Sequence, residues 1–156
     1  ALIKAGCDVL AQHCDTTAPQ EASENNGTWA IGYNSDMSKE TPKATLTSVI
    51  WNWSAYYTSY ISSIINASYS GENYYGGMKE SLVSLTELSS LCDDQTAEKV
   101  KEAKEKIVSG DFGVFDGVLK TNTGDSIGEE GKTLDDAKIT GEINWYYHNV
   151  SELKWK

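Results

Sequence analysis

The chain has 156 residues, of which 39% are hydrophobic and 23% are charged, and its formal net charge at pH 7 is −10. This length suits one domain with a substantial core better than two sizeable domains. So acidic a chain repels phosphate backbones and anionic lipid, which argues against nucleic acid and membrane surfaces as partners. No apolar run approaches the roughly 20 residues that a transmembrane helix requires.

The first 33 residues predict a strand, a helix and a second strand. The short apolar run 8–12 is typical of a buried strand. Thr17 followed by Gln20 has the pattern of a capping box, and Gly27 suits the left-handed residue that ends a helix. The apolar run 29–33 predicts the second strand, so the two strands are expected to lie parallel in a βαβ unit.

The same alternation continues further along the chain. The run 45–51, rich in β-branched residues, predicts a third strand. A helix capped by Ser54 and ended by Gly71 is expected next. Its apolar residues recur at helical spacing: Tyr57, Tyr60, Ile61, Ile64 and Ile65.

A fourth strand region of uncertain limits is expected between residues 74 and 88. The helix after it is expected to begin at Asp94 or Thr96 and to end at Gly110. Its apolar residues are expected on one face: Val100, Ala103, Ile107 and Val108.

Beyond residue 110, a hairpin turn is expected around 122–124, and Thr133 with Asp136 predicts the cap of a short helical turn. The three cysteines are Cys7, Cys14 and Cys92, and we expect free thiols and no metal site. The elements together predict an α/β fold, a parallel-sheet lobe over residues 1–156.

Polar side chains follow three of the predicted strands. His13 and Asp15 follow the first strand, Asn34 and Asp36 the second, and the triplet 51–53 (WNW) the third. In an open parallel sheet, ligands bind beyond the carboxyl ends of the strands. One interpretation places these side chains around a small ligand, and the other treats them as the polar caps that strand-to-helix loops require. The residue pattern leaves both open.

Each individual residue also has both a ligand-binding and a structural interpretation. His13 could bind a ligand or act as a base oriented by Asp15, but no Ser or Cys nucleophile stands in a recognisable motif beside them. Trp51 and Trp53 could stack on a flat ring or pack in the core. Lys79 could donate to a ligand or be solvated. No glycine-rich phosphate-binding motif occurs, which argues against nucleotides held by their phosphates.

Several stretches resemble the basic-membrane-protein (BMP) family: "AGCDVLAQHCDTTAPQEASENNGTWAIGYNSDM", "ATLTSVIWNW", "YGGMKESLVSL", "VKEAKEKIVSGDFGVFDG" and "TLDDAKITGEINWYYHNV". Members are bacterial lipoproteins that bind nucleosides and purine bases for ABC transporters. The resemblance implies a type I periplasmic-binding-protein-like fold with two α/β lobes that close on the ligand by a hinge. The chain matches the C-terminal part, so it is expected to be a fragment that binds purine weakly or not at all when isolated.

The resemblance also suggests the ligand. In the nucleoside-binding branch, the second strand ends in "GVDxDQ", whose first acid is expected to hold the ribose; here Asn34 replaces that acid and Asp36 is kept. The third strand ends with indoles where that branch often has Lys-Arg, which favours a flat, uncharged base such as adenine. Lys79 matches the lysine of the family's "GLKEG", although Ser81 replaces its last glycine. The expected ligand-binding residues are His13, Asp15, Asn34, Asp36, Trp51, Asn52, Trp53 and Lys79.

The remaining expectations follow from the same resemblance. The protein is expected to bind without catalysis or cofactor, to deliver its ligand to an ABC permease, and to be extracytoplasmic, anchored by a lipidated cysteine upstream. The segment 54–70 is a candidate to cross to the other lobe, and the surface left by the missing lobe favours self-association. Two alternatives stay open: a ligand-sensing regulatory domain of the same fold, and a purine-acting hydrolase that uses His13 and Asp15.

Overall fold

The computed structural model describes residues 1–151 of the chain. Its contacts divide the chain into two compact units, Ala1–Val108 and the part from Ser109 onward. The first unit contains the larger sheet and all the predicted ligand-binding residues, and each unit is described by itself below.

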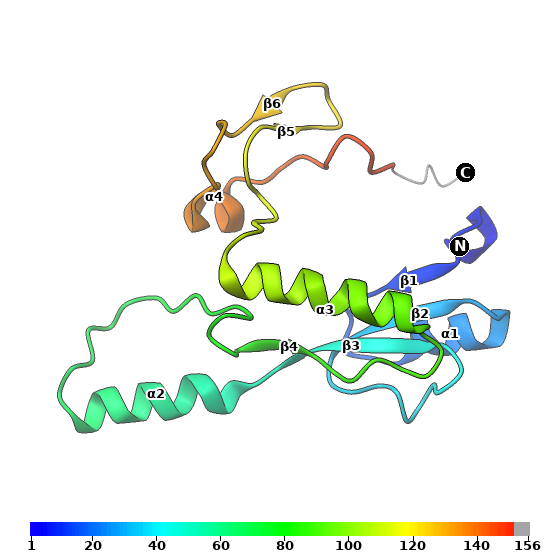
Figure 1. Ribbon diagram of the computed structural model, residues 1–156, viewed down its shortest axis with the longest axis horizontal. Helices are drawn as coiled ribbons and strands as arrows, with labels where there is room; N and C mark the ends of the chain where they lie inside the picture. Colours follow the sequence, from blue (N-terminus) through cyan, green and yellow to red (C-terminus); the bar gives the residue numbers. More distant parts are fainter. Residues whose placement is uncertain (152–156) are drawn as a thin grey trace. The chain divides into compact units, whose positions relative to one another are not determined.

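The first unit is built on a four-stranded sheet in which the strands follow one another in chain order (Figure 1). Its strands are β1 (Val9–Ala11), β2 (Trp29–Asn34), β3 (Thr45–Trp51) and β4 (Val83–Leu85). The first three are parallel, which confirms the predicted parallel-sheet α/β fold. β4 is antiparallel to β3, with Trp51 opposite Val83, a direction that the sequence pattern does not specify. The chain leaves β3 at its carboxyl end and enters β4 at the same end of the sheet, so the two strands are antiparallel.

Helix α1 (Ala18–Asn26) connects β1 to β2, packs against both strands and ends at Gly27, where φ is 67°. The predicted capping box is wrong. The Thr17 hydroxyl donates to the Glu21 carboxylate (2.6 Å) and makes no cap hydrogen bond to the backbone. Gln20 is fully buried, because its side chain lies on the face of α1 that packs against the sheet.

The core beneath α1 is small and largely polar. Gln20 donates through Nε2 to Met37 Sδ (2.9 Å) and accepts from Gln12 Nε2 (3.1 Å), so its buried amide is satisfied. Gly32 of β2 lies opposite Ser48 of β3, and a Cβ atom on Gly32 would overlap the Ser48 hydroxyl. The close approach of these two strands therefore requires glycine at position 32.

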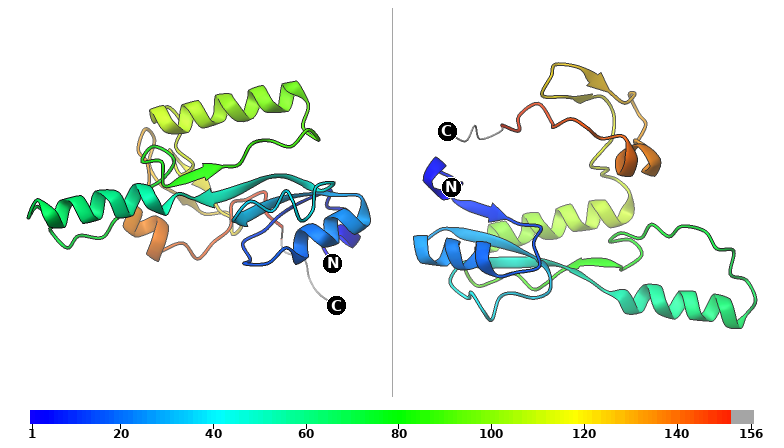
Figure 2. Two further views of the ribbon diagram at one scale, coloured as in Figure 1. Left: turned by 90° about the horizontal axis from the view of Figure 1, so that it is seen from below. Right: turned by 180° about the vertical axis from the view of Figure 1, so that it is seen from behind.

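Helix α2 spans Trp53–Ile65, with Asn52 at the N-cap. The predicted Ser54 cap is wrong: its hydroxyl donates to the Asn52 side chain (2.5 Å). The predicted end at Gly71 is also wrong, because the helix stops at Ile65. α2 extends away from the sheet and, among the described residues, has no extensive packing against another helix or strand (Figures 1 and 2). Its apolar residues are accordingly exposed, with Ile65 at 77%.

The turn that leads into β4 contains Ser81, whose φ of 60° lies in the left-handed region that favours glycine. The Ser81 N–H donates to the Met78 carbonyl (3.1 Å) and the Leu82 N–H to the Gly77 carbonyl (3.0 Å), so the turn is held from both sides. The family pattern that the sequence resembles has glycine at this position.

Replacing Ser81 with glycine should therefore stabilise the protein by about 0.5–1 kcal/mol. The left-handed conformation costs a side-chain-bearing residue about 1–2 kcal/mol, and the flexibility of glycine in the unfolded chain offsets part of that gain. Urea denaturation measures the difference. Ser90→Gly is the matched control, since exposed Ser90 has no positive φ and glycine there should be neutral or destabilising. A destabilised Ser81→Gly protein would contradict this account.

Helix α3 (Asp94–Ser109) begins as predicted. The Asp93 carboxylate accepts from the Thr96 N–H (2.7 Å), and hydrogen bonding from Thr96 lowers the pKa of Asp93. Gly110 follows the helix with a φ of 85°, as expected. The predicted apolar face is only partly covered: Val100 and Ile107 are half-buried, whereas Ala103 and Val108 are exposed.

The second unit contains the predicted hairpin. Strands β5 (Leu119–Lys120) and β6 (Ser126–Ile127) pair antiparallel around Gly124, whose φ is 92°. Helix α4 (Asp136–Gly141) is capped by Asp135, which accepts from the Lys138 N–H (2.8 Å). The predicted Thr133 cap is wrong, because the Thr133 hydroxyl donates to Asp116 instead.

Candidate functional site

The carboxyl ends of β1, β2 and β3 bring a row of aromatic rings together. His13 lies 4.1 Å from Tyr33 between ring centroids, Tyr33 lies 6.3 Å from Trp51 in an edge-on contact, and Trp51 stacks on Trp53 at 5.6 Å. We call these four residues the aromatic row. Such a row presents the flat, polarisable faces on which a planar ligand ring can stack.

Strand register explains why the row forms. Tyr33 on β2 pairs with Val49 on β3, and Trp51 lies two residues after Val49. Alternate residues of a strand point to the same face of a sheet, so Tyr33 and Trp51 project on the same side. His13 follows β1, the strand that lies beside β2. Three of these four residues were among the predicted ligand-binding residues; Tyr33 was predicted only as part of the second strand.

Two predicted polar residues meet each other at the carboxyl ends of β1 and β2. The side-chain amide of Asn34 donates to the Asp15 carboxylate (Nδ2 to Oδ1, 3.2 Å). Asp15 follows β1 and Asn34 ends β2, so adjacent parallel strands place them together. Asn34 has a φ of 71°, a left-handed conformation that asparagine tolerates better than most residues. Both side chains are exposed and accessible to a ligand.

The other three predicted polar residues are not linked to the row by the contacts of the described chain. Asp36 accepts from the Ser38 N–H (3.0 Å), and hydrogen bonding from the side chain and backbone of Ser38 lowers the pKa of Asp36. Asn52 accepts from Ser54 and, through its backbone N–H, donates to the Leu82 carbonyl (2.7 Å). Lys79 is exposed in the turn before β4. Because its pKa is lowered, the Asp36 carboxylate stays ionised at neutral pH and can accept hydrogen bonds.

A pocket of about 390 Å³ opens beside the two indoles. This volume is within the range of small-molecule sites, roughly 300–1,000 Å³. The residues that line it come from β3, α2 and the segment before β4: Trp51, Trp53, Tyr56, Tyr74, Tyr75, Gly76 and Leu82. Only the two tryptophans were predicted. Tyr56 belongs to the predicted helix, and Tyr74 and Tyr75 to the predicted fourth-strand region of uncertain limits, so the sequence did not place these tyrosines beside the indoles.

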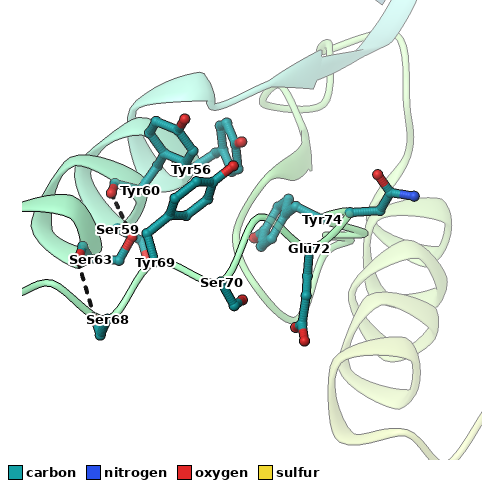
Figure 3. Close-up of a pocket in the computed structure, with 10 residues that line it drawn as sticks. Tyr56, Ser59, Tyr60, Ser63, Ser68, Tyr69, Ser70, Glu72 and Tyr74 are labelled. Carbon is teal, nitrogen blue, oxygen red and sulfur yellow. Dashed lines mark hydrogen bonds between the residues drawn. The ribbon is translucent and has the colours of Figure 1, made fainter.

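A second pocket, of about 220 Å³, lies between α2 and the segment that follows it (Figure 3). Tyrosine and serine side chains line it, and Tyr60 and Tyr69 meet edge-on at 5.0 Å between ring centroids. A hydrogen bond with the Tyr69 side chain raises the pKa of Tyr60. The residues that line this pocket all belong to α2 and its following segment, and two of them, Tyr56 and Tyr74, also line the pocket beside the indoles.

The cysteines are free thiols, as predicted. Within residues 1–151, no cluster of three or more His, Cys, Asp or Glu side chains is arranged to hold a metal ion. Over the same residues, no helix has both the length and the hydrophobicity of a membrane span.

A family model described as "Bmp: ABC transporter substrate-binding protein PnrA-like" matches residues 1–116. The chain belongs to the Bmp family. The match covers β1 to β4 and therefore the strand ends that form the aromatic row, which confirms the resemblance noted in the sequence.

Two curated proteins are similar to this Bmp chain. A purine-binding protein of Brucella abortus (strain 2308) is 32% identical over 152 residues, which is 97% of this chain and 43% of the relative. A protein of Haloferax volcanii named as a candidate ABC transporter glucose-binding protein is 31% identical over 117 residues, 75% of this chain and 30% of the relative. The Bmp chain thus spans less than half the length of either relative.

Two solved structures share the fold. A transcriptional activator of the comK gene from Bacillus halodurans superimposes with a TM-score of 0.63 at 24% identity, over 71% of this chain and 40% of that one. An ABC transporter solute-binding protein from Conexibacter woesei superimposes with a TM-score of 0.52 at 18% identity, over 72% of this chain and 39% of that one. At these identities the likeness concerns the fold of this Bmp chain alone.

Proposed function

We propose that this chain forms part of the ligand-binding site of an ABC-transporter substrate-binding protein, and that its ligand is a purine base, adenine or a close analogue. The observation that carries the proposal is that an aromatic row and the Asp15–Asn34 pair both form at the carboxyl ends of neighbouring parallel strands. The row offers stacking faces, and the pair offers hydrogen-bonding groups. The Brucella relative's description as a purine-binding protein supports the same ligand class.

A base is favoured over a nucleoside by the chemistry of position 34. An ionised carboxylate accepts hydrogen bonds from two ribose hydroxyls, whereas an amide supplies both a donor and an acceptor to the edge of a heterocycle. Asn34 therefore suits a purine edge better than a sugar. His13, Asp36, Asn52 and Lys79 remain proposed contributors around it.

The proposed role needs binding and release rather than chemistry, so we propose no catalysis and no cofactor. The partner is an ABC permease, and the location is extracytoplasmic with a lipid anchor upstream. The segment 54–70 is proposed to cross to a second lobe, which the exposed apolar side chains of α2 support. In the absence of that lobe, the same surface would favour self-association of the isolated chain.

Isothermal titration of the full-length protein that contains these 156 residues tests the proposal. Adenine, guanine, adenosine, guanosine and glucose are titrated separately under one set of conditions. We expect heat from the bases and none from the nucleosides or glucose. Tight binding of nucleosides would show that Asn34 still serves a ribose. Binding of glucose alone, or of none of the five, would overturn the purine assignment.

A further inference from the structure

Asp15 can determine which way the side-chain amide of Asn34 faces. An ionised carboxylate is only an acceptor of hydrogen bonds, whereas a side-chain amide has a donor end and an acceptor end. The hydrogen bond from Asn34 Nδ2 to Asp15 Oδ1 (3.2 Å) is therefore possible in one amide orientation and lost in the other, because two oxygens would then face each other. The contact selects one of the two amide flips.

The backbone around Asn34 restricts the remaining freedom. Asn34 is the last residue of β2 and is paired with Ile50 of β3, and its φ of 71° is a conformation with little room to vary. The preceding residue, Tyr33, is held between the His13 and Trp51 rings. The backbone of Asn34 is thus restricted, and the hydrogen bond to Asp15 gives its side-chain amide a preferred orientation.

An amide held in one orientation presents a fixed order of hydrogen-bonding groups to the ligand. When one N–H of the Asn34 amide donates to Asp15, the Oδ1 and the second N–H of Asn34 remain available to a heterocycle. A 6-aminopurine offers an amino donor beside a ring-nitrogen acceptor, and a 6-oxopurine offers an oxygen acceptor beside a ring N–H donor. A purine stacked on the aromatic row in one pose can match only one of these orders, whereas a freely flipping amide can match both.

We propose that Asp15 is a positioning residue that sets the discrimination between 6-amino- and 6-oxopurines by holding the Asn34 amide in one orientation. This inference rests on the proposed purine-binding function. It adds a role for a side chain that acts through Asn34, and it makes specificity rather than affinity the property that Asp15 controls.

The experiment compares adenine and hypoxanthine by isothermal titration of the full-length wild-type protein and of Asp15→Asn. Asparagine at position 15 can face Asn34 with either end of its own amide, so it keeps the contact without selecting an orientation. We expect the wild type to prefer one base by roughly tenfold or more, the size of effect that one mismatched hydrogen-bonding pair produces. In Asp15→Asn, the ratio of the two dissociation constants should approach one. Asp15→Glu, which keeps an acceptor-only group, should retain part of the preference.

Asp8→Asn is the matched control, because it removes the same charge at the opposite end of β1 and should leave the ratio unchanged. Thermal unfolding checks that each variant is folded. Equal weakening of both bases in Asp15→Asn, an unchanged ratio, or a wild type without preference would overturn the inference while leaving purine binding intact. A wild type that binds neither base would instead refute the proposed function.

Discussion

Replacing Trp51 with alanine is expected to weaken purine binding by the full-length protein about five- to 150-fold. Stacking of a base on an aromatic side chain contributes roughly 1–3 kcal/mol when measured by alanine substitution. We expect the largest effect at Trp51 because its ring contacts both Tyr33 and Trp53 and also lines the 390 Å³ pocket. Its removal should eliminate a stacking face and also leave Tyr33 and Trp53 without their common neighbour.

Titration of adenine into wild type, Trp51→Ala and Trp51→Phe measures the effect. Phenylalanine keeps a smaller aromatic face, so its affinity should fall between the other two. Trp29→Ala is the control, because Trp29 is an exposed tryptophan at the amino end of β2, whereas the row lies at the carboxyl end. If Trp51→Ala bound adenine as tightly as the wild type, the row would not be the stacking surface.

Replacing Gly32 with alanine is expected to destabilise the protein by about 2–3 kcal/mol. The new Cβ atom would overlap the Ser48 hydroxyl and lie 3.1 Å from Gln20 Nε2, and both of these side chains are fully buried. Ser48 also accepts from the Met37 N–H (3.3 Å), so its hydroxyl cannot turn away without leaving that donor unpaired. Overpacking of a closed core commonly costs about 1–3 kcal/mol, and a disturbed buried hydrogen bond adds to it.

The free energy of unfolding in urea measures this cost. Gly141→Ala is the matched control, because a Cβ atom there meets nothing within 4 Å and the φ of Gly141 is not left-handed; that variant should be neutral or slightly stabilised. Combining Gly32→Ala with Ser48→Ala should recover part of the loss, since the overlapping oxygen is removed. Full stability of the single variant would mean that β2 and β3 can separate without penalty.

Local sequence signals predicted those elements whose limits depend on a few neighbouring residues. The β-branched run 45–51 coincides with β3, Gly27 ends α1, and the start of α3 and the hairpin near Gly124 agree with expectation. The errors at Thr17, Ser54 and Thr133 share one feature. Each hydroxyl donates to a side-chain oxygen, of Glu21, Asn52 and Asp116 respectively, and such side-chain hydrogen bonds compete with the backbone contact that a capping pattern assumes.

The site divides in the same way. The order of the strands along the chain predicts that polar and aromatic residues collect at the strand ends, which is why His13, Asn34 and Trp51 were predicted as site residues. The contacts of Tyr33 with His13 and Trp51 were not predicted, because they depend on the register between β2 and β3 and on the loop after β1.

The sequence alone therefore indicated the α/β class, the βαβ opening and the family, and it predicted that a ligand binds at the carboxyl edge of the sheet. Only the tertiary structure revealed that β4 is antiparallel to β3, that Gln20 is buried and that α2 extends away from the sheet. The hydrogen bond between Asn34 and Asp15 was likewise visible only in the structure. The physical reason is the distance along the chain over which each effect acts. Periodicity and turn chemistry act over a few residues, whereas register, burial and side-chain pairing depend on which distant segments of the chain become neighbours.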